Sequence, residues 1–193
     1  MAYDYRKVAG SLVFLGGAQF VLGMLLAEAI YPGYSVSQNY ISDLGVGPAA
    51  SVFNFSVFLL GLLILMGAYF IQRTFGNRLF TALLVLAGVG AMGVGVFPED
   101  SPLMHEIVSD MAFIFAGLAP LAAWKVVKKP FAYFSVAMGL LSLSALVLLS
   151  AEYSFGLGEQ FFLGLGPGGM ERMIVYPVLL WETTLGGYLM SSP

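Results

Sequence analysis

The only histidine of the chain lies close to a serine and a carboxylate. His105 and Ser109 stand at positions i and i+4, so a helix would place them on one face, with Asp110 slightly displaced. A histidine with a carboxylate neighbour can act as a general base, and a serine can in principle be its nucleophile. The same segment also suits the start of a helix, where acids are favourable without any catalysis. Both interpretations stay open, and the candidate catalytic residues are His105, Asp110 and Asp43.

A Ser-Asp pair recurs along the sequence. Residues 41–44 read Ile-Ser-Asp-Leu ahead of the second apolar segment, and residues 108–111 read Val-Ser-Asp-Met at the start of the fourth. At a comparable spacing further on, the sixth apolar segment begins with Glu171 and Arg172. Such a repeat predicts three helical hairpins related by an axis along the membrane normal. We therefore expect one acid from each hairpin to converge near Arg172, namely Asp43, Asp110 and Glu171.

Arg172 is a charged residue within an apolar segment, and such residues mark a function or a buried ion pair. A guanidinium beside carboxylates forms bidentate hydrogen bonds. In one interpretation Arg172 pairs with one of the three converging acids and holds the hairpins together. In the other it binds a lipid phosphate or a substrate carboxylate. The candidate ligand-binding residues are Arg172, Glu171, Ser42 and Ser109.

Glu182 is an acid in the middle of the last apolar segment. A helix would place it on nearly the same face as Glu171 and about 16 Å deeper. At that depth a carboxyl group is expected to be protonated or hydrogen bonded. It is either a proton-coupling group or a neutral packing acid.

We expect neither a metal nor a cofactor. The chain has one histidine and no cysteine, whereas zinc hydrolase sites use two or three histidines. A hard cation held by the carboxylates of Glu99, Asp100 and Glu106 is the only conceivable metal. The sequence also contains no phosphate-binding glycine loop and no basic surface for nucleic acid.

The composition is that of a membrane protein. The 193 residues are 59% hydrophobic and only 10% charged, so the chain needs lipid around its apolar surface. Segments of about twenty apolar residues are long enough to cross a bilayer as helices. We expect an all-α bundle of six transmembrane helices in a single domain, 1–193, with helices at about 8–30, 52–71, 79–96, 107–124, 131–150 and 170–190. The glycine-rich segment 151–169 is expected to lie at the membrane interface or to re-enter it.

Basic and acidic residues are segregated between the connections. The basic residues other than Arg172 flank the first segment or lie in alternate connections: Arg6, Lys7, Arg73, Arg78, Lys125, Lys128 and Lys129. Retained loops keep Lys and Arg, so both termini are expected in the cytoplasm of a multi-pass cell-membrane protein. Most acids would then lie in or beyond the membrane.

Small residues are concentrated in the third segment. The segment contains Gly88, Gly90, Gly93 and Gly95, and it places Ala87, Ala91 and Gly95 at four-residue spacing. Small residues at that spacing let helix backbones approach closely in lipid. The segment is expected to pack tightly against its neighbours or to form one smooth wall of a cavity.

Three motifs together resemble a known family. These are residues 41–45 (Ile-Ser-Asp-Leu-Gly), residues 97–105 from Phe-Pro-Glu-Asp to the histidine, and Glu171-Arg172 ahead of Trp181. Their order resembles the domain-of-unknown-function family numbered 998, over nearly the whole chain. The resemblance implies a small multi-pass membrane protein without a settled activity. The first motif is also distantly similar to a loop of Frag1/DRAM-type membrane proteins, which have threonine where this chain has Leu44, and this similarity implies lipid handling.

The expected function follows from these observations. The leading hypothesis is a polar pocket of acids, Arg172 and His105 on the extracytoplasmic side that binds or modifies a lipid or amphiphile. An enzyme of this kind would be a lipid head-group hydrolase or transferase with His105 as its base. The alternatives are a transporter or ion- or proton-conducting protein, and a structural subunit without catalysis. Membrane lipids are the expected partners, and the sequence does not predict the oligomeric state.

Overall fold

The protein is an all-helical bundle. The computed structural model describes residues 4–156 and 164–191. The helices are α1 (Tyr5–Ile30), α2 (Ala50–Phe75), α3 (Arg78–Val96), α4 (Pro102–Ala123), α5 (Phe131–Phe155) and α6 (Gly166–Ser191), with two short 3-10 helices, η1 (Ser42–Gly45) and η2 (Gly47–Ala49), between α1 and α2. The predicted polytopic helical bundle is therefore confirmed.

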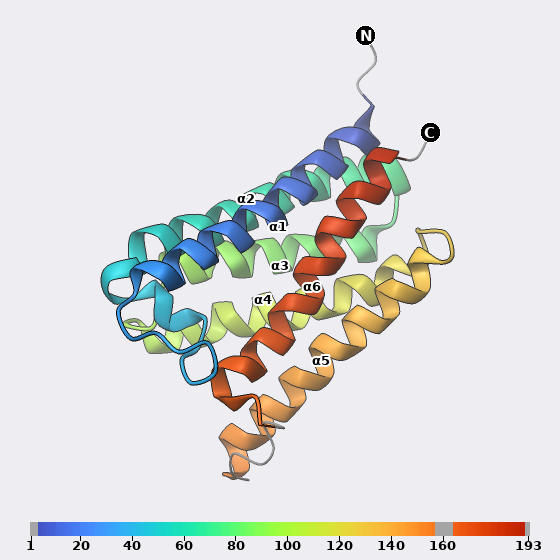
Figure 1. The fold of residues 1–193 in the computed structure, drawn as a ribbon. Helices are drawn as coiled ribbons and strands as arrows, with labels where there is room; N and C mark the ends of the chain where they lie inside the picture. Colours follow the sequence, from blue (N-terminus) through green and yellow to red (C-terminus); the bar gives the residue numbers. More distant parts are fainter. Residues whose placement is uncertain (1–3, 157–163, 192–193) are drawn as a thin grey trace.

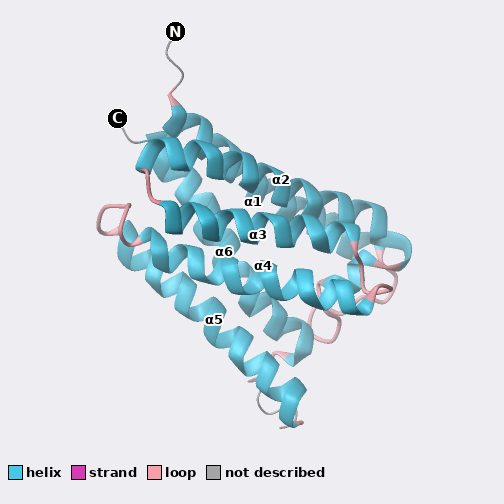
Figure 2. Ribbon diagram, turned by 180° about the vertical axis from the view of Figure 1, so that it is seen from behind, coloured by secondary structure: helices cyan, strands magenta, loops and turns pink. Residues whose placement is uncertain are grey.

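The six helices form a closed ring in chain order. Each helix packs against the next one in the sequence, and α6 closes the ring by packing against α1 (Figure 1). Both termini lie at one end of the bundle, with the α2–α3 and α4–α5 connections. The long α1–α2 loop and the α3–α4 connection lie at the opposite end, as the reverse view shows (Figure 2). This order is the one that three successive hairpins would give, although the internal repeat stays a prediction.

Five of the described helices, α1 to α5, are long and apolar enough to cross a membrane. Helix α6 is as long as α1 and runs beside it, but it carries Glu171, Arg172 and Glu182. It also has more buried residues than any other described helix. Its polar side chains are therefore shielded by protein, which removes the cost of exposing them to lipid.

Several helices extend beyond the apolar segments that predict them. Helix α4 begins at Pro102, a residue favoured in the first turn, instead of at about residue 107. Helix α5 continues to Phe155, where Gly156 adopts a left-handed conformation that ends it. Part of the segment predicted to lie at the interface, residues 157–163, is outside the described residues.

Helix α3 lies unusually close to its neighbours. A Cβ at Gly90 would collide with the backbone of α4 at Ala112, and one at Gly95 would lie 2.6 Å from the backbone oxygen of Asn54 on α2. These two glycines therefore let α3 pack backbone to backbone on both sides.

The basic residues of the connections lie at the end that holds the termini. Several of them stack on aromatic rings there: Arg6 on Tyr188, Arg73 on Tyr5, and Lys129 on both Trp124 and Tyr133. The two ends of the bundle thus differ in charge.

Candidate functional site

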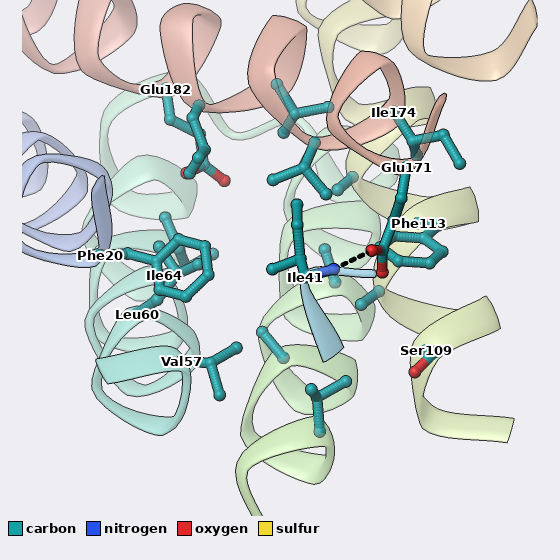
Figure 3. Close-up of a pocket in the computed structure, with 18 of the residues that line it drawn as sticks. Phe20, Ile41, Val57, Leu60, Ile64, Ser109, Phe113, Glu171, Ile174 and Glu182 are labelled. Carbon is teal, nitrogen blue, oxygen red and sulfur yellow. Dashed lines mark hydrogen bonds between the residues drawn. The ribbon is translucent and has the colours of Figure 1, made fainter. Parts of the chain in front are cut away.

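A cavity of about 100 Å³ lies inside the ring of helices. Every one of the six helices and the loop before η1 contribute to its wall, which is largely apolar (Figure 3). Its polar lining residues are Ser42, Ser109, Ser142, Glu171 and Glu182. The cavity has room for a small ring or several methylene groups.

Small side chains on two adjacent helices leave this space open. Ala87, Gly88 and Ala91 of α3 line the cavity beside Ala112 and Ala116 of α4. The small residues of α3 thus serve both expected purposes, close packing and a smooth cavity wall. Gly90 and Gly95 pack against neighbouring backbones, while Ala87 and Ala91 line the cavity.

Two carboxyl groups on α6 face the cavity, and they differ in their partners. Glu171 and Glu182 are each 5% exposed. A carboxylate oxygen of Glu171 accepts a hydrogen bond from the backbone N–H of Ile41 (Figure 3). Within the described part of the chain, Oε2 of Glu182 is buried without a hydrogen-bond partner.

Arg172 is bound on both terminal nitrogens by protein groups. Its Nη2 donates to Glu28 Oε1 at 2.6 Å and to the Tyr34 hydroxyl at 2.7 Å. Its Nη1 donates to the backbone oxygens of Gly168 at 3.0 Å, Val36 at 2.9 Å and Asn39 at 3.3 Å. Any ligand of the terminal guanidinium nitrogens would have to displace these groups, so the arrangement ties α1, the α1–α2 loop and α6 together.

The ion-pair partner of Arg172 differs from the expectation. The prediction that it pairs with Asp43, Asp110 or Glu171 is wrong, because Glu28 in the last turn of α1 forms the salt bridge. Glu28 reaches Arg172 because α1 packs directly against α6. The sequence signal for Glu28 is an acid near the end of an apolar helix, which does not by itself identify its partner.

Tyr34 links the same cluster to the loop. Its hydroxyl donates to the backbone oxygen of Tyr40 at 2.8 Å and accepts from Arg172. Burial raises the pKa of Tyr34 to about 12, so the hydroxyl keeps its proton at neutral pH. The tyrosine is therefore a neutral hydrogen-bonding member of the cluster.

The α1–α2 loop is also docked on the start of α6. Ser37 donates from its hydroxyl to the backbone oxygen of Leu165 at 2.8 Å, and its own backbone oxygen accepts from the N–H of Gly168 at 3.0 Å. A Cβ at Gly168 would collide with the backbone oxygen of Asn39. Glycine is required there because the loop crosses α6 backbone to backbone.

A second polar cluster surrounds Glu99 at this end of the bundle. Ser42 donates to Glu99 Oε1 at 2.5 Å, and Asp43 Oδ2 accepts from the Asn39 side chain at 2.9 Å and the Tyr40 N–H at 3.0 Å. Burial raises the pKa of Glu99, the Ser42 hydrogen bond opposes this shift, and the nearby Asp43 carboxylate adds to it.

His105 and Asp110 do not form a pair. The Nδ1 of His105 lies 2.8 Å from the backbone oxygen of Phe97, and it must carry the proton because a carbonyl oxygen only accepts. Asp110 is exposed, whereas Ser109 beside it lines the cavity. The structure therefore brings Ser42, Asp43, Glu99 and His105 to one cluster and leaves Asp110 outside it.

The three carboxylates considered for a hard cation lie in different environments. Glu99 is bound to Ser42, while Asp100 and Glu106 are exposed. Among the residues that the structure describes, no group of three His, Asp or Glu side chains is placed to hold a metal ion.

The raised pKa of Glu99 makes a prediction about stability and pH. Below its ordinary pKa the group is neutral in both the folded and the unfolded chain, but as the pH rises the unfolded chain ionises first. The stability that the neutral carboxyl contributes is therefore lost as pH rises from the ordinary value through the raised one. We therefore expect the melting temperature of the wild type in detergent, minus that of Glu99→Gln, to fall as the pH rises through that interval.

Asp100→Asn controls for the loss of one exposed negative charge. A difference in melting temperature between wild type and Glu99→Gln that stays constant with pH would contradict the expectation.

The fold and its apolar helices define a polytopic membrane protein. Residues 14–188 match a family model described as protein of unknown function (DUF998), and the chain belongs to this family. The resemblance expected from the three sequence motifs is thereby confirmed. No curated protein and no solved structure matches the chain. The similarity to Frag1/DRAM-type proteins stays a prediction.

Proposed function

We propose that this protein binds a small amphiphile, or one end of a membrane lipid, in its central cavity. The observation that carries the proposal is an apolar cavity walled by all six helices, with carboxyl and hydroxyl groups at a few points. Ligand sites typically combine an apolar lining with a small number of polar groups that orient the ligand. The predicted role of membrane lipids as partners is thus kept, but the expected binding group moves from Arg172 to the cavity.

Binding is a better match to the geometry than head-group chemistry. His105 donates to the backbone at Phe97, and none of the candidate catalytic residues His105, Asp43 and Asp110 is among the described residues that line the cavity. A base and its orienting carboxylate would need to lie within hydrogen-bond reach of one another and of the substrate. Hydrolysis or transfer with His105 as base therefore ranks below binding.

Proton or ion conduction is the second candidate. Glu171 and Glu182 both face the cavity from α6, about 16 Å apart along the helix. Two acids on one face are the observation that favours a path. The wall between them is apolar, so the binding function has the stronger support.

We also propose an orientation in the cell membrane. The termini and the basic connections face the cytoplasm, because retained connections keep Lys and Arg. The Arg172 cluster would then lie on the extracytoplasmic side.

Filling the cavity tests the proposal. A photoreactive diazirine alcohol with an alkyl tail, added to the protein in lipid nanodiscs, is expected to label cavity-lining peptides of α3 and α6. The larger side chain of Ala91→Phe occupies the cavity, so we expect its labelling to fall about ten-fold, equivalent to about 1.4 kcal/mol of binding. Labelled peptides are identified by mass spectrometry.

The matched control is Ala82→Phe, which places the same side chain at an exposed position of α3. It should label like the wild type. Equal labelling of Ala91→Phe and wild type, or labelling confined to the outer surface, would contradict binding in the cavity.

A further inference from the structure

We propose that the ligand of the central cavity carries an amine, whose ammonium group pairs with Glu182. This inference rests on the proposed function and names the class of ligand that the same cavity would take. The partner is thus an amphiphilic amine, with its nitrogen at Glu182 and its apolar part among the surrounding side chains.

Glu182 presents to the cavity a buried carboxyl oxygen that no group of the described residues bonds. Its side chain is 5% exposed, it lines the cavity, and its Oε2 has no hydrogen-bond donor within the described residues. A buried oxygen without a donor costs free energy, and a ligand that supplies the donor removes this cost. Glu171 differs, because the N–H of Ile41 already donates to it.

The charges of the cavity wall select a cation. Among the described residues, the ionisable side chains that line it are Glu171 and Glu182, without any Lys, Arg or His. An anionic head group would meet two acids there, and Arg172, the residue after Glu171, is already paired with Glu28 outside the lining. An amine forms the same ion pair from either protonation state. An ammonium group pairs directly with a carboxylate, and a neutral amine takes the proton of a neutral carboxyl group to give the same pair.

The surroundings of Glu182 also suit an alkylammonium group. Phe20 and Ile64 lie across the cavity from the carboxyl group (Figure 3). The apolar side chains there accommodate the carbon chain next to the nitrogen. On α1, Gly17 lies beside this carboxyl group, since a Cβ built there would be in ordinary van der Waals contact with Glu182 Oε2, at 3.7 Å.

A pair of probes that differ only in the head group tests the inference. Photoreactive diazirine probes with the same tail, one a primary amine and the other an alcohol, are titrated onto the full chain in neutral-lipid nanodiscs. We expect the cavity of the wild type to be labelled at about ten-fold lower concentrations of the amine than of the alcohol. In Glu182→Gln, which keeps the shape and removes the charge, this preference should disappear, so that the two probes label the cavity at similar concentrations.

Glu171→Gln is the matched control, because it changes the other acid of the same helix and cavity. It should keep the preference for the amine. Equal labelling of the wild type by both probes would overturn the inference while leaving the proposed function intact, and this comparison needs no variant to fold. Persistence of the preference in Glu182→Gln would overturn the role of Glu182. Failure of both probes to label the cavity would instead refute the proposed function, and the inference with it.

Discussion

Replacing Arg172 by glutamine is expected to destabilise the protein by about 3–5 kcal/mol, the usual loss when one partner of a buried ion pair is removed. Glu28, whose side chain is only 16% exposed, would be left without its cation. Three backbone oxygens would also lose their donor. The attachment of the α1–α2 loop to α6 should then weaken, while the hydrogen bonds of Ser37 to the start of α6 remain. The measurement is the unfolding free energy or melting temperature in mild detergent.

A double-mutant cycle separates the ion pair from the rest of the cluster. Glu28→Gln and the double variant Glu28→Gln/Arg172→Gln should show that the two losses are not additive, because the residues are in direct contact. A loss below about 1 kcal/mol for Arg172→Gln would indicate an exposed, weakly coupled pair and contradict the structural role.

Gly90→Leu is expected to cost about 3 kcal/mol, at the upper end of the range for overpacking. The new side chain would collide with the backbone of α4 at Ala112, and the oxygen of Val108 would lie 2.9 Å from the new Cβ. Backbone cannot rotate away as a side chain can, so α3 and α4 must separate. Thermal unfolding and the monodisperse fraction after purification would report this loss.

Gly187→Leu provides the control within another helix. An added Cβ at Gly187 meets nothing within 4 Å, and leucine favours the helix more than glycine does. This variant should be as stable as the wild type or more so. Similar losses for the two variants would show that the effect of Gly90 does not arise from contact between α3 and α4.

The helical bundle is predictable from the sequence because α1 to α5 are each a continuous apolar segment, and α6 is an apolar segment interrupted by a few charged residues. The partner of Arg172 is not predictable in this way. Glu28 and Arg172 are far apart in the chain, and they meet only because α6 closes the ring against α1. The docking of Ser37 on Gly168 depends on the same packing and leaves only a glycine as its signal.

The Ser-Asp pairs show why the type of a residue does not settle its role. Ser42 and Ser109 line the cavity, whereas Asp43 binds its own loop and Asp110 is exposed. Successive residues of a helix point about 100° apart, so only one member of each pair can face the bundle axis. The motif therefore indicates where this end of the cavity lies. Knowing that the serine, and not the aspartate, of each pair faces the cavity requires the position of the bundle axis.

An experimental structure in lipid nanodiscs with the added amphiphilic amine tests the central claim most directly. We predict elongated non-protein density inside the ring of helices, with one end within hydrogen-bond distance of Glu182 and the rest between Phe20 and the alanines of α3. A cavity closed by protein side chains, with Glu182 paired to a protein donor and the amine absent, would contradict the account.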